Sequence, residues 1–130
     1  MAPKTILLVE DEPLLIKFVS SVLLRAGFAV LSAESADEAL RLEADFTPPI
    51  DLLLTGVYLP RVSGAELAQR LEWRRPGIPV VLMSGDPTVQ PLATSYGWHF
   101  IQKPFLAADL VRLIGDALGL EPVVASAARA

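Results

Sequence analysis

Short, mostly apolar runs alternate with amphipathic segments along most of the chain. The apolar runs cover residues 5–9, 28–31, 50–54, 80–83 and 98–101. A short run that is largely apolar, most clearly residues 5–9, is typical of a strand buried on both faces. Between and after these runs, apolar residues recur three and four positions apart, which predicts amphipathic helices, the weakest of them over residues 87–96. The pattern therefore predicts five consecutive strand–helix units.

Start signals support several of these helices. Pro13 stands where the first helical turn begins, a position that tolerates its missing N–H. Ser35 with Glu38, and Ser63 with Glu66, have the spacing of a capping box, in which the serine accepts a hydrogen bond from a backbone N–H of the first turn. We therefore expect the second and third helices to begin beside Ser35 and Ser63.

Buried strands separated by amphipathic helices predict an α/β fold with a parallel sheet covered on both faces. Right-handed crossovers leave few arrangements, and the flavodoxin-like, doubly wound (βα)5 order 2-1-3-4-5 is favoured among them. In such sheets ligands bind at the carboxyl ends of the strands. The residues that end each strand are therefore the candidates for function.

Composition narrows the function classes. The chain has 130 residues, enough for one domain, and no cysteine, which excludes disulfides, thiolate metal sites and cysteine nucleophiles. The net charge of −4 and the lack of a basic stripe argue against nucleic-acid binding. No apolar run is long enough to span a membrane and no cleavable signal pattern is present, so we expect a cytoplasmic protein. Residues 121–130, rich in small side chains, are expected to form a flexible tail.

Polar side chains gather at the predicted strand ends. Glu10 and Asp11 follow the first strand, Gly56 the third, Ser84 the fourth and Lys103 the fifth. Carboxylates are ligands that Mg²⁺ prefers, while a hydroxyl and an ammonium suit phosphate oxygens. The alternative is a solvated ion-pair network that only caps the sheet. Convergence at the predicted ligand edge favours a site for a cation and a phosphoryl group.

Four segments carry a more specific signal: ILLVEDEP, DLLLTGVYLPRVSG, VVLMSGD and FIQKPF. In order and spacing they resemble the signature segments of the receiver domain of bacterial two-component response regulators, in its single-domain, chemotaxis-regulator-like form. The resemblance covers about residues 4–118 and implies a receiver domain over residues 1–120. It also implies a signalling and binding module that is not an enzyme. Its partners would be a sensor histidine kinase or phosphotransfer protein and a downstream partner.

The resemblance assigns roles to residues of this chain. It implies that Asp11 and Glu10 bind Mg²⁺, together with the backbone carbonyl of Tyr58. It implies that Ser84 and Lys103 bind the phosphoryl group, with a Lys103–Pro104 bond that is often cis in the family. The aromatic switch position of the fifth strand falls on Phe100.

Gly56 departs from the family pattern, in which the phosphorylated aspartate lies four residues before a proline, here Pro60. Asp51 lies at the far end of the same strand, and Thr55 points to the opposite side of it. We therefore predict no stable phosphorylation at residue 56 and a weak Mg²⁺ site. We also expect Lys103 to turn to Asp11 or Glu10, and water to fill the space at the glycine.

Two alternatives stay open for the function. The chain is either a receiver that signals without phosphorylation or a conventional phospho-switch that carries an Asp-to-Gly substitution. A small flavodoxin-like enzyme or carrier is the rival class, but the acidic residues after the first strand would repel a flavin phosphate. Three aromatic residues mark a candidate partner or homodimer face formed by the fourth helix, fifth strand and fifth helix: Tyr96, Trp98 and Phe105.

Overall fold

The structure is a computed structural model that describes residues 2–120. Strands and helices alternate along the chain, as predicted: β1 (Thr5–Val9), α1 (Pro13–Arg25), β2 (Ala29–Ala33), α2 (Ala36–Asp45), β3 (Leu52–Gly56), α3 (Gly64–Arg74), β4 (Val80–Ser84), α4 (Val89–Ser95), β5 (His99–Gln102) and α5 (Ala107–Ala117). The five strands form one parallel sheet in the order β2-β1-β3-β4-β5. The predicted flavodoxin-like fold is confirmed. The predicted tail, residues 121–130, lies outside the described residues.

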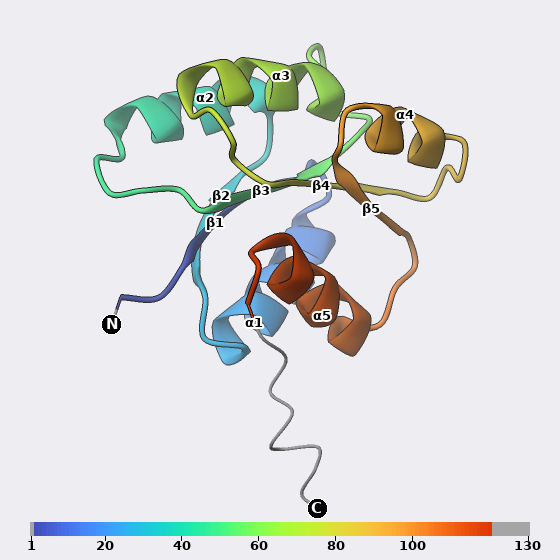
Figure 1. The fold of residues 1–130 in the computed structure, drawn as a ribbon, viewed down its shortest axis with the longest axis horizontal. Helices are drawn as coiled ribbons and strands as arrows, with labels where there is room; N and C mark the ends of the chain where they lie inside the picture. Colours follow the sequence, from blue (N-terminus) through green and yellow to red (C-terminus); the bar gives the residue numbers. More distant parts are fainter. Residues whose placement is uncertain (1, 121–130) are drawn as a thin grey trace, which may run out of the picture.

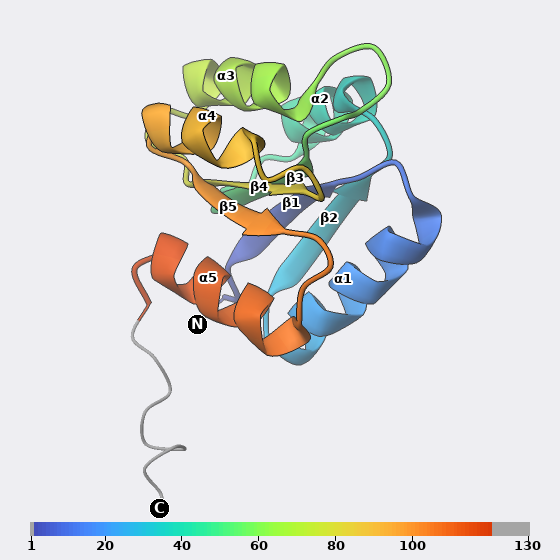
Figure 2. The ribbon, with the colours of Figure 1, turned by 90° about the vertical axis from the view of Figure 1, so that its right-hand side faces the viewer.

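Helices cover both faces of the sheet, as Figure 1 shows: α2, α3 and α4 on one side, α1 and α5 on the other. The view turned by 90° (Figure 2) shows the same three layers. Neighbouring strand residues point to opposite faces, so Leu7 and Leu53 join the core under α2–α4. Leu8 and Leu54 join the core under α1 and α5. Burial on both faces explains why these strands are largely apolar.

The predicted helix starts are confirmed. Ser35 caps α2 and Ser63 caps α3, each through a hydroxyl that accepts from the backbone N–H three residues later at 3.1 Å. The carboxylate of Glu38 turns back to the backbone N–H of Glu34 at 2.8 Å, one residue before the cap. Pro13 is the first residue of α1. Local sequence signals thus determine where these helices begin.

The predicted strand ends were displaced, most clearly in β3. This strand covers Leu52–Gly56 rather than residues 50–54, so Gly56 is its last residue instead of lying two residues beyond its end. Hydrogen-bonded neighbours extend the strand: Thr55 lies beside Val9 of β1, and Gly56 lies beside Met83 of β4. The boundary therefore depends on pairing with the adjacent strands. The residues of β3 by themselves carry no information about that pairing.

Gly64, the first residue of α3, brings that helix against the end of β3. Its N–H donates to the carbonyl of Val57 at 2.8 Å. A Cβ at this position would overlap the carbonyl oxygen of Gly56. The close approach of the two backbones therefore requires glycine at residue 64.

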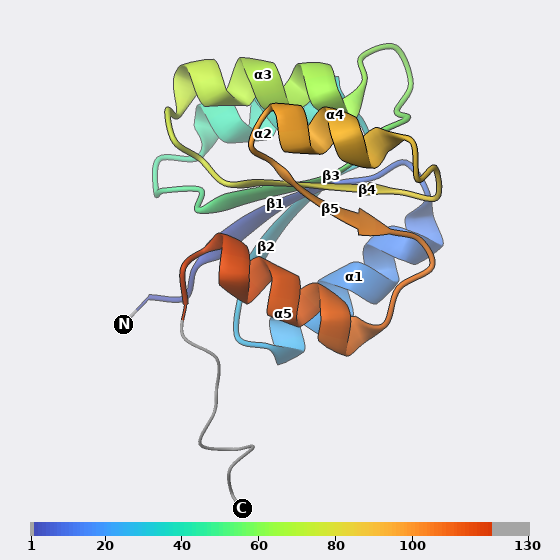
Figure 3. The same ribbon diagram turned by 45° about the vertical axis from the view of Figure 1, so that its right-hand side comes forward.

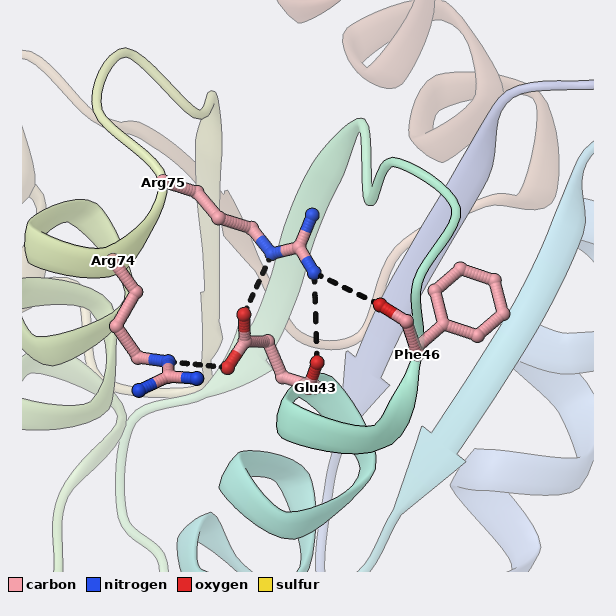
Figure 4. A network of polar contacts seen from close by, with 4 residues as sticks. All are labelled: Glu43, Phe46, Arg74 and Arg75. Carbon is pink, nitrogen blue, oxygen red and sulfur yellow. Dashed lines mark hydrogen bonds and ion pairs between the residues drawn. The ribbon is translucent and has the colours of Figure 1, made fainter.

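A buried carboxylate ties α2 to the end of α3 (Figure 4). Glu43 is only 4% exposed and accepts hydrogen bonds from the Nε atoms of Arg74 and Arg75. Arg75 also donates to the backbone carbonyls of Glu43, at 3.5 Å, and Phe46, at 3.3 Å. We call these four residues the α2–α3 clamp. The clamp satisfies a buried charge that would otherwise oppose folding.

The helices of the described part of the chain, residues 2–120, include none that is both long enough and apolar enough to cross a bilayer.

Candidate functional site

A pocket of about 300 Å³ lies at the carboxyl ends of the strands. Figure 3 shows the connections that follow β1, β4 and β5 leaving the sheet at the same edge. The residues that line the pocket come from the ends of β1, β3, β4 and β5: Glu10, Asp11, Glu12, Gly56, Val57, Tyr58, Met83, Ser84, Gly85 and Lys103. The predicted convergence of acid, hydroxyl and ammonium groups at one edge is therefore confirmed.

The centre of the pocket is an ion pair between Glu10 and Lys103. The Nζ atom of Lys103 lies 3.1 Å from Oε1 of Glu10 and 3.9 Å from Oε1 of Glu12. Glu10 is 2% exposed, and this burial raises the pKa of its carboxyl group, while the charge of Lys103 opposes the shift. Of the two partners expected for Lys103, the structure selects Glu10; Asp11 is exposed.

The carboxylate of Glu10 also fills the space beside Gly56. A Cβ built on Gly56 would lie 2.6 Å from Oε1 of Glu10, closer than real Cβ contacts come. Glu10 therefore takes up part of the space in which we expected water, and Gly56 still lines the pocket of about 300 Å³. The carboxylate of Glu10 lies 3.1 Å from the Nζ atom of Lys103, whose positive charge favours this position.

Ser84 has a structural partner. Its side chain is buried, and its hydroxyl accepts a hydrogen bond from the backbone N–H of Asp86 at 3.0 Å. This contact is the turn-capping role that a serine at a strand end ordinarily plays. The hydroxyl still lines the pocket, so the geometry is compatible with a second role there.

A hydrogen bond that the sequence did not predict links two loops at the rim of the pocket. The hydroxyl of Tyr58, after β3, donates to Oδ2 of Asp86, after β4, at 2.7 Å. Asp86 accepts further hydrogen bonds from Thr88. The bond from the Thr88 side chain contributes most to lowering the pKa of Asp86, and the bond from Tyr58 contributes next. The same contact raises the pKa of Tyr58. The resemblance assigned only the backbone carbonyl of Tyr58, so its side chain was missed.

The donor set does not fit a magnesium site as it is arranged. Within residues 2–120, no three His, Cys, Asp or Glu side chains are grouped so that they could hold a metal. Asp11 and Glu10 both line the pocket, but Glu10 is engaged by Lys103. A divalent ion would have to displace an ammonium group from its carboxylate partner.

The aromatic residues around β5 differ in exposure. Tyr96 is 46% exposed and stacks on Trp98, with ring centroids 4.4 Å apart. Trp98 is buried in the core, which corrects its assignment to a contact surface. Phe105 is half-buried against the other core, and Phe100 is half-buried against the same core as Trp98. Only Tyr96 among the three interface candidates is largely accessible.

Comparison with known proteins identifies the family. Residues 6–115 match the family model described as the response regulator receiver domain. The chain belongs to this family. A crystal structure of a response regulator receiver domain protein from Clostridium thermocellum superposes with a TM-score of 0.82 at 28% identity, covering 89% of this chain and 94% of that one. The receiver domain of NtrX from Brucella abortus gives a TM-score of 0.79 at 30% identity, over 89% and 99% of the two chains.

Longer proteins also match. The phosphate regulon transcriptional regulatory protein PhoB of Pseudomonas aeruginosa is 34% identical over 117 residues, which cover 85% of this chain and 50% of that protein. The chain spans half or less of the length of the curated relatives it matches. The relatives therefore contain regions with no counterpart in these 130 residues.

Membership places the chain in two-component signal transduction. Receiver domains interact with histidine kinases and downstream effectors, and in general they bind Mg²⁺ at the phosphorylation site. The family is a signalling module rather than a class of conventional enzymes. The alternative of a small flavodoxin-like enzyme or carrier gains no support from these matches.

Proposed function

We propose that this receiver domain is a binding module of two-component signalling that does not accept a phosphoryl group at residue 56. In this proposal Gly56 stands where the family carries its phosphorylated aspartate. The observation that carries it is the position of Gly56: the residue ends β3 and lines one pocket with Glu10, Ser84 and Lys103. A glycine there has no nucleophilic atom to form an acyl phosphate.

Neighbouring residues on β3 do not replace the missing acceptor. The side chain of Thr55 is fully buried, and its hydroxyl donates to the carbonyl of Gly56 at 2.8 Å. Asp51 precedes the strand, and its carboxylate accepts from the backbone N–H of Thr5 at 2.7 Å, at the opposite edge of the sheet. These contacts support the view that β3 offers no acceptor to the pocket.

Weak Mg²⁺ binding is the second part of the proposal. Phosphoryl transfer to an aspartate depends on a cation that neutralises the developing charge. Glycine at residue 56 removes one carboxylate, and Lys103 occupies Glu10. A module of this kind would signal by binding a kinase, a phosphotransfer protein or a downstream partner, and the α4-β5-α5 face with exposed Tyr96 is our candidate for partner binding or self-association.

A conventional phospho-switch that has lost its aspartate by substitution is the second candidate. It is favoured by the retention of Ser84 and Lys103 in the pocket. Both candidates predict no adduct on the chain with Gly56. Only partial phosphorylation of a variant with a restored carboxylate favours the first, and full phosphorylation favours the second.

The test compares the natural chain with the variant Gly56→Asp after incubation with acetyl phosphate and Mg²⁺, using intact-protein mass spectrometry. We expect no covalent phosphoryl adduct on the natural chain and an adduct on the variant. Gly85→Asp is the matched control, because it adds a carboxylate to the same pocket rim from a neighbouring loop, where a Cβ meets only ordinary contact. We expect no adduct there.

An adduct on the natural chain would overturn the proposal. An inert Gly56→Asp variant that folds normally would show that residue 56 is not the acceptor position. Partial recovery measures how much of a phospho-switch the remaining residues still provide.

A further inference from the structure

We infer that Glu10 is a positioning residue that stands in for the carboxylate missing at residue 56: it holds Lys103 from within the pocket and keeps the site in one arrangement without phosphate or metal. This inference rests on the proposed function, since it presumes that residue 56 is the position that lacks a carboxylate. It assigns a role to the pair Glu10–Gly56 rather than to either residue alone.

The backbones of the two charged residues are fixed at the edge of the sheet. The N–H of Glu10 donates to the carbonyl of Ala33 at 3.0 Å, and the N–H of Lys103 donates to the carbonyl of Ser84 at 2.9 Å. Both residues thus continue the sheet hydrogen bonding directly after β1 and β5. Only the side chains are left to adjust, and they meet at 3.1 Å in the pocket.

The position of the carboxylate depends on glycine at residue 56. A Cβ at this position would lie 2.6 Å from Oε1, 3.4 Å from Cδ of Glu10 and 3.6 Å from Cδ2 of Leu59. Even one methyl group would therefore force the end of the Glu10 side chain to move. By contrast, a Cβ at Gly85 meets nothing closer than the carbonyl of Lys103 at 3.9 Å.

Charge explains why the carboxylate stays there. A buried carboxylate without a partner is costly, and Lys103 is the cation that the pocket supplies. The backbone N–H of Glu12 adds only a long contact of 3.4 Å to Oε2. Lys103, in turn, is 25% exposed and can keep part of its hydration. The charges of Glu10 and Lys103 thus balance each other within the pocket, without phosphate or metal.

The experiment moves the carboxylate from residue 10 to residue 56 and follows the Lys103 ammonium group by NMR. In the natural chain we expect an Nζ signal that is slow to exchange with water and sensitive to the ion pair. Glu10→Gln should shift that signal and speed its exchange with water, because only an amide oxygen and the more distant Glu12 carboxylate remain as partners. The double variant Glu10→Gln with Gly56→Asp should restore it, because the introduced carboxylate comes from the other side of the same space.

Gly56→Ala provides a second arm with Gly85→Ala as its control. Gly56→Ala should shift the Lys103 signal by displacing the Glu10 carboxylate, and Gly85→Ala should leave the signal unchanged. Urea unfolding of every variant separates loss of the ion pair from loss of the fold.

A Lys103 signal that Glu10→Gln leaves unchanged, or a folded double variant that does not recover the original signal, would overturn the inference. The proposed function fails by a different observation, a phosphoryl adduct on the natural chain, which leaves the Lys103 result untouched. The two claims are therefore separable.

Discussion

Glu43 and Glu10 are both buried carboxylates, but the first is held by two arginines and the second by one lysine. In the α2–α3 clamp, each oxygen of Glu43 accepts from a different guanidinium group, and Arg75 also binds two backbone carbonyls (Figure 4). In the pocket, Glu10 has one ammonium partner and a long contact to a backbone N–H. Both carboxylate oxygens of Glu43 therefore have a charged partner, whereas only one oxygen of Glu10 does.

The difference shows how the same residue type serves structure in one place and a site in another. A guanidinium group is planar, presents its donors in a fixed geometry and is always charged, so it suits a permanent link between helices. An ammonium group is a compact charge on a flexible chain, which can change partners with small movements. Burial alone therefore does not distinguish the two glutamates; the number and type of their partners does.

The largest effect should follow from breaking the clamp. Glu43→Ala leaves Arg75, which is 23% exposed, without its carboxylate. Removing one partner of a buried ion pair typically costs about 3–5 kcal/mol, and because both arginines reach solvent we expect a loss of about 3 kcal/mol in the free energy of unfolding. Urea unfolding measures it.

The control for this prediction is Glu66→Ala, which removes the exposed partner of Arg70. Exposed pairs are worth about 0.5 kcal/mol or less. Equal losses in the two variants would contradict the structural importance assigned to the clamp.

A smaller effect is expected when the pocket is crowded. Gly56→Ala should lower the free energy of unfolding by about 1 kcal/mol, because overpacking costs about 1–3 kcal/mol and replacing glycine in a strand returns part of this. Gly85→Ala should change it by about 0.5 kcal/mol at most. Denaturant midpoints of the two variants provide the comparison, and a stabilised Gly56→Ala would show that Glu10 does not need the space.

The stability of the domain should also depend on pH through the ionisation of Glu10. Burial raises its folded-state pKa above the ordinary value of 4.5, so the folded domain binds its proton more tightly than the unfolded chain does. The stability that this proton contributes is fully present below 4.5 and is lost as the pH rises through the folded-state pKa. Relative to Glu10→Gln, the natural chain should therefore lose stability as the pH increases over that window. Unfolding curves of both proteins at several pH values test the sign, and a difference that grows in the other direction would refute it.

The smallest effect on stability should come from removing the Tyr58–Asp86 hydrogen bond at the rim of the pocket. Tyr58→Phe removes the hydrogen bond between the two loops, and both side chains are on the surface, so stability should hardly change. The pKa of Asp86 should rise but stay below its ordinary value, because the contacts from Thr88 remain. NMR titration of the Asp86 carboxyl group measures this, and an unchanged pKa would mean that the bond from Tyr58 is not formed in solution.

Several features of the site could be predicted from the sequence because they depend on local pattern. Apolar runs of the right length predict buried strands, and parallel strands bring their carboxyl ends to one edge, so Glu10, Ser84 and Lys103 had to lie near one another. Asp51 could be placed at the opposite edge by the same argument. The helix starts at Ser35 and Ser63 follow from contacts that span only three residues.

Other features could not be predicted, because they depend on residues far apart in the chain. Glu43 lies 31 and 32 positions from the two arginines that bind it, and no spacing rule connects them. Trp98 had the appearance of an interface residue until the packing of α2–α4 showed it to be buried.

Order and chemistry were thus determined by the sequence alone: five strand–helix units, and a pocket at their carboxyl edge that gathers acid, hydroxyl and ammonium groups beside a glycine. Only the tertiary structure decided how the remaining charges responded. Lys103 could have turned to either acid, and the choice of Glu10 required the actual distance across 93 residues of chain. The physical reason is that periodicity selects which face of an element is buried, whereas partner choice depends on separations of a few ångströms between elements that only the folded chain brings together.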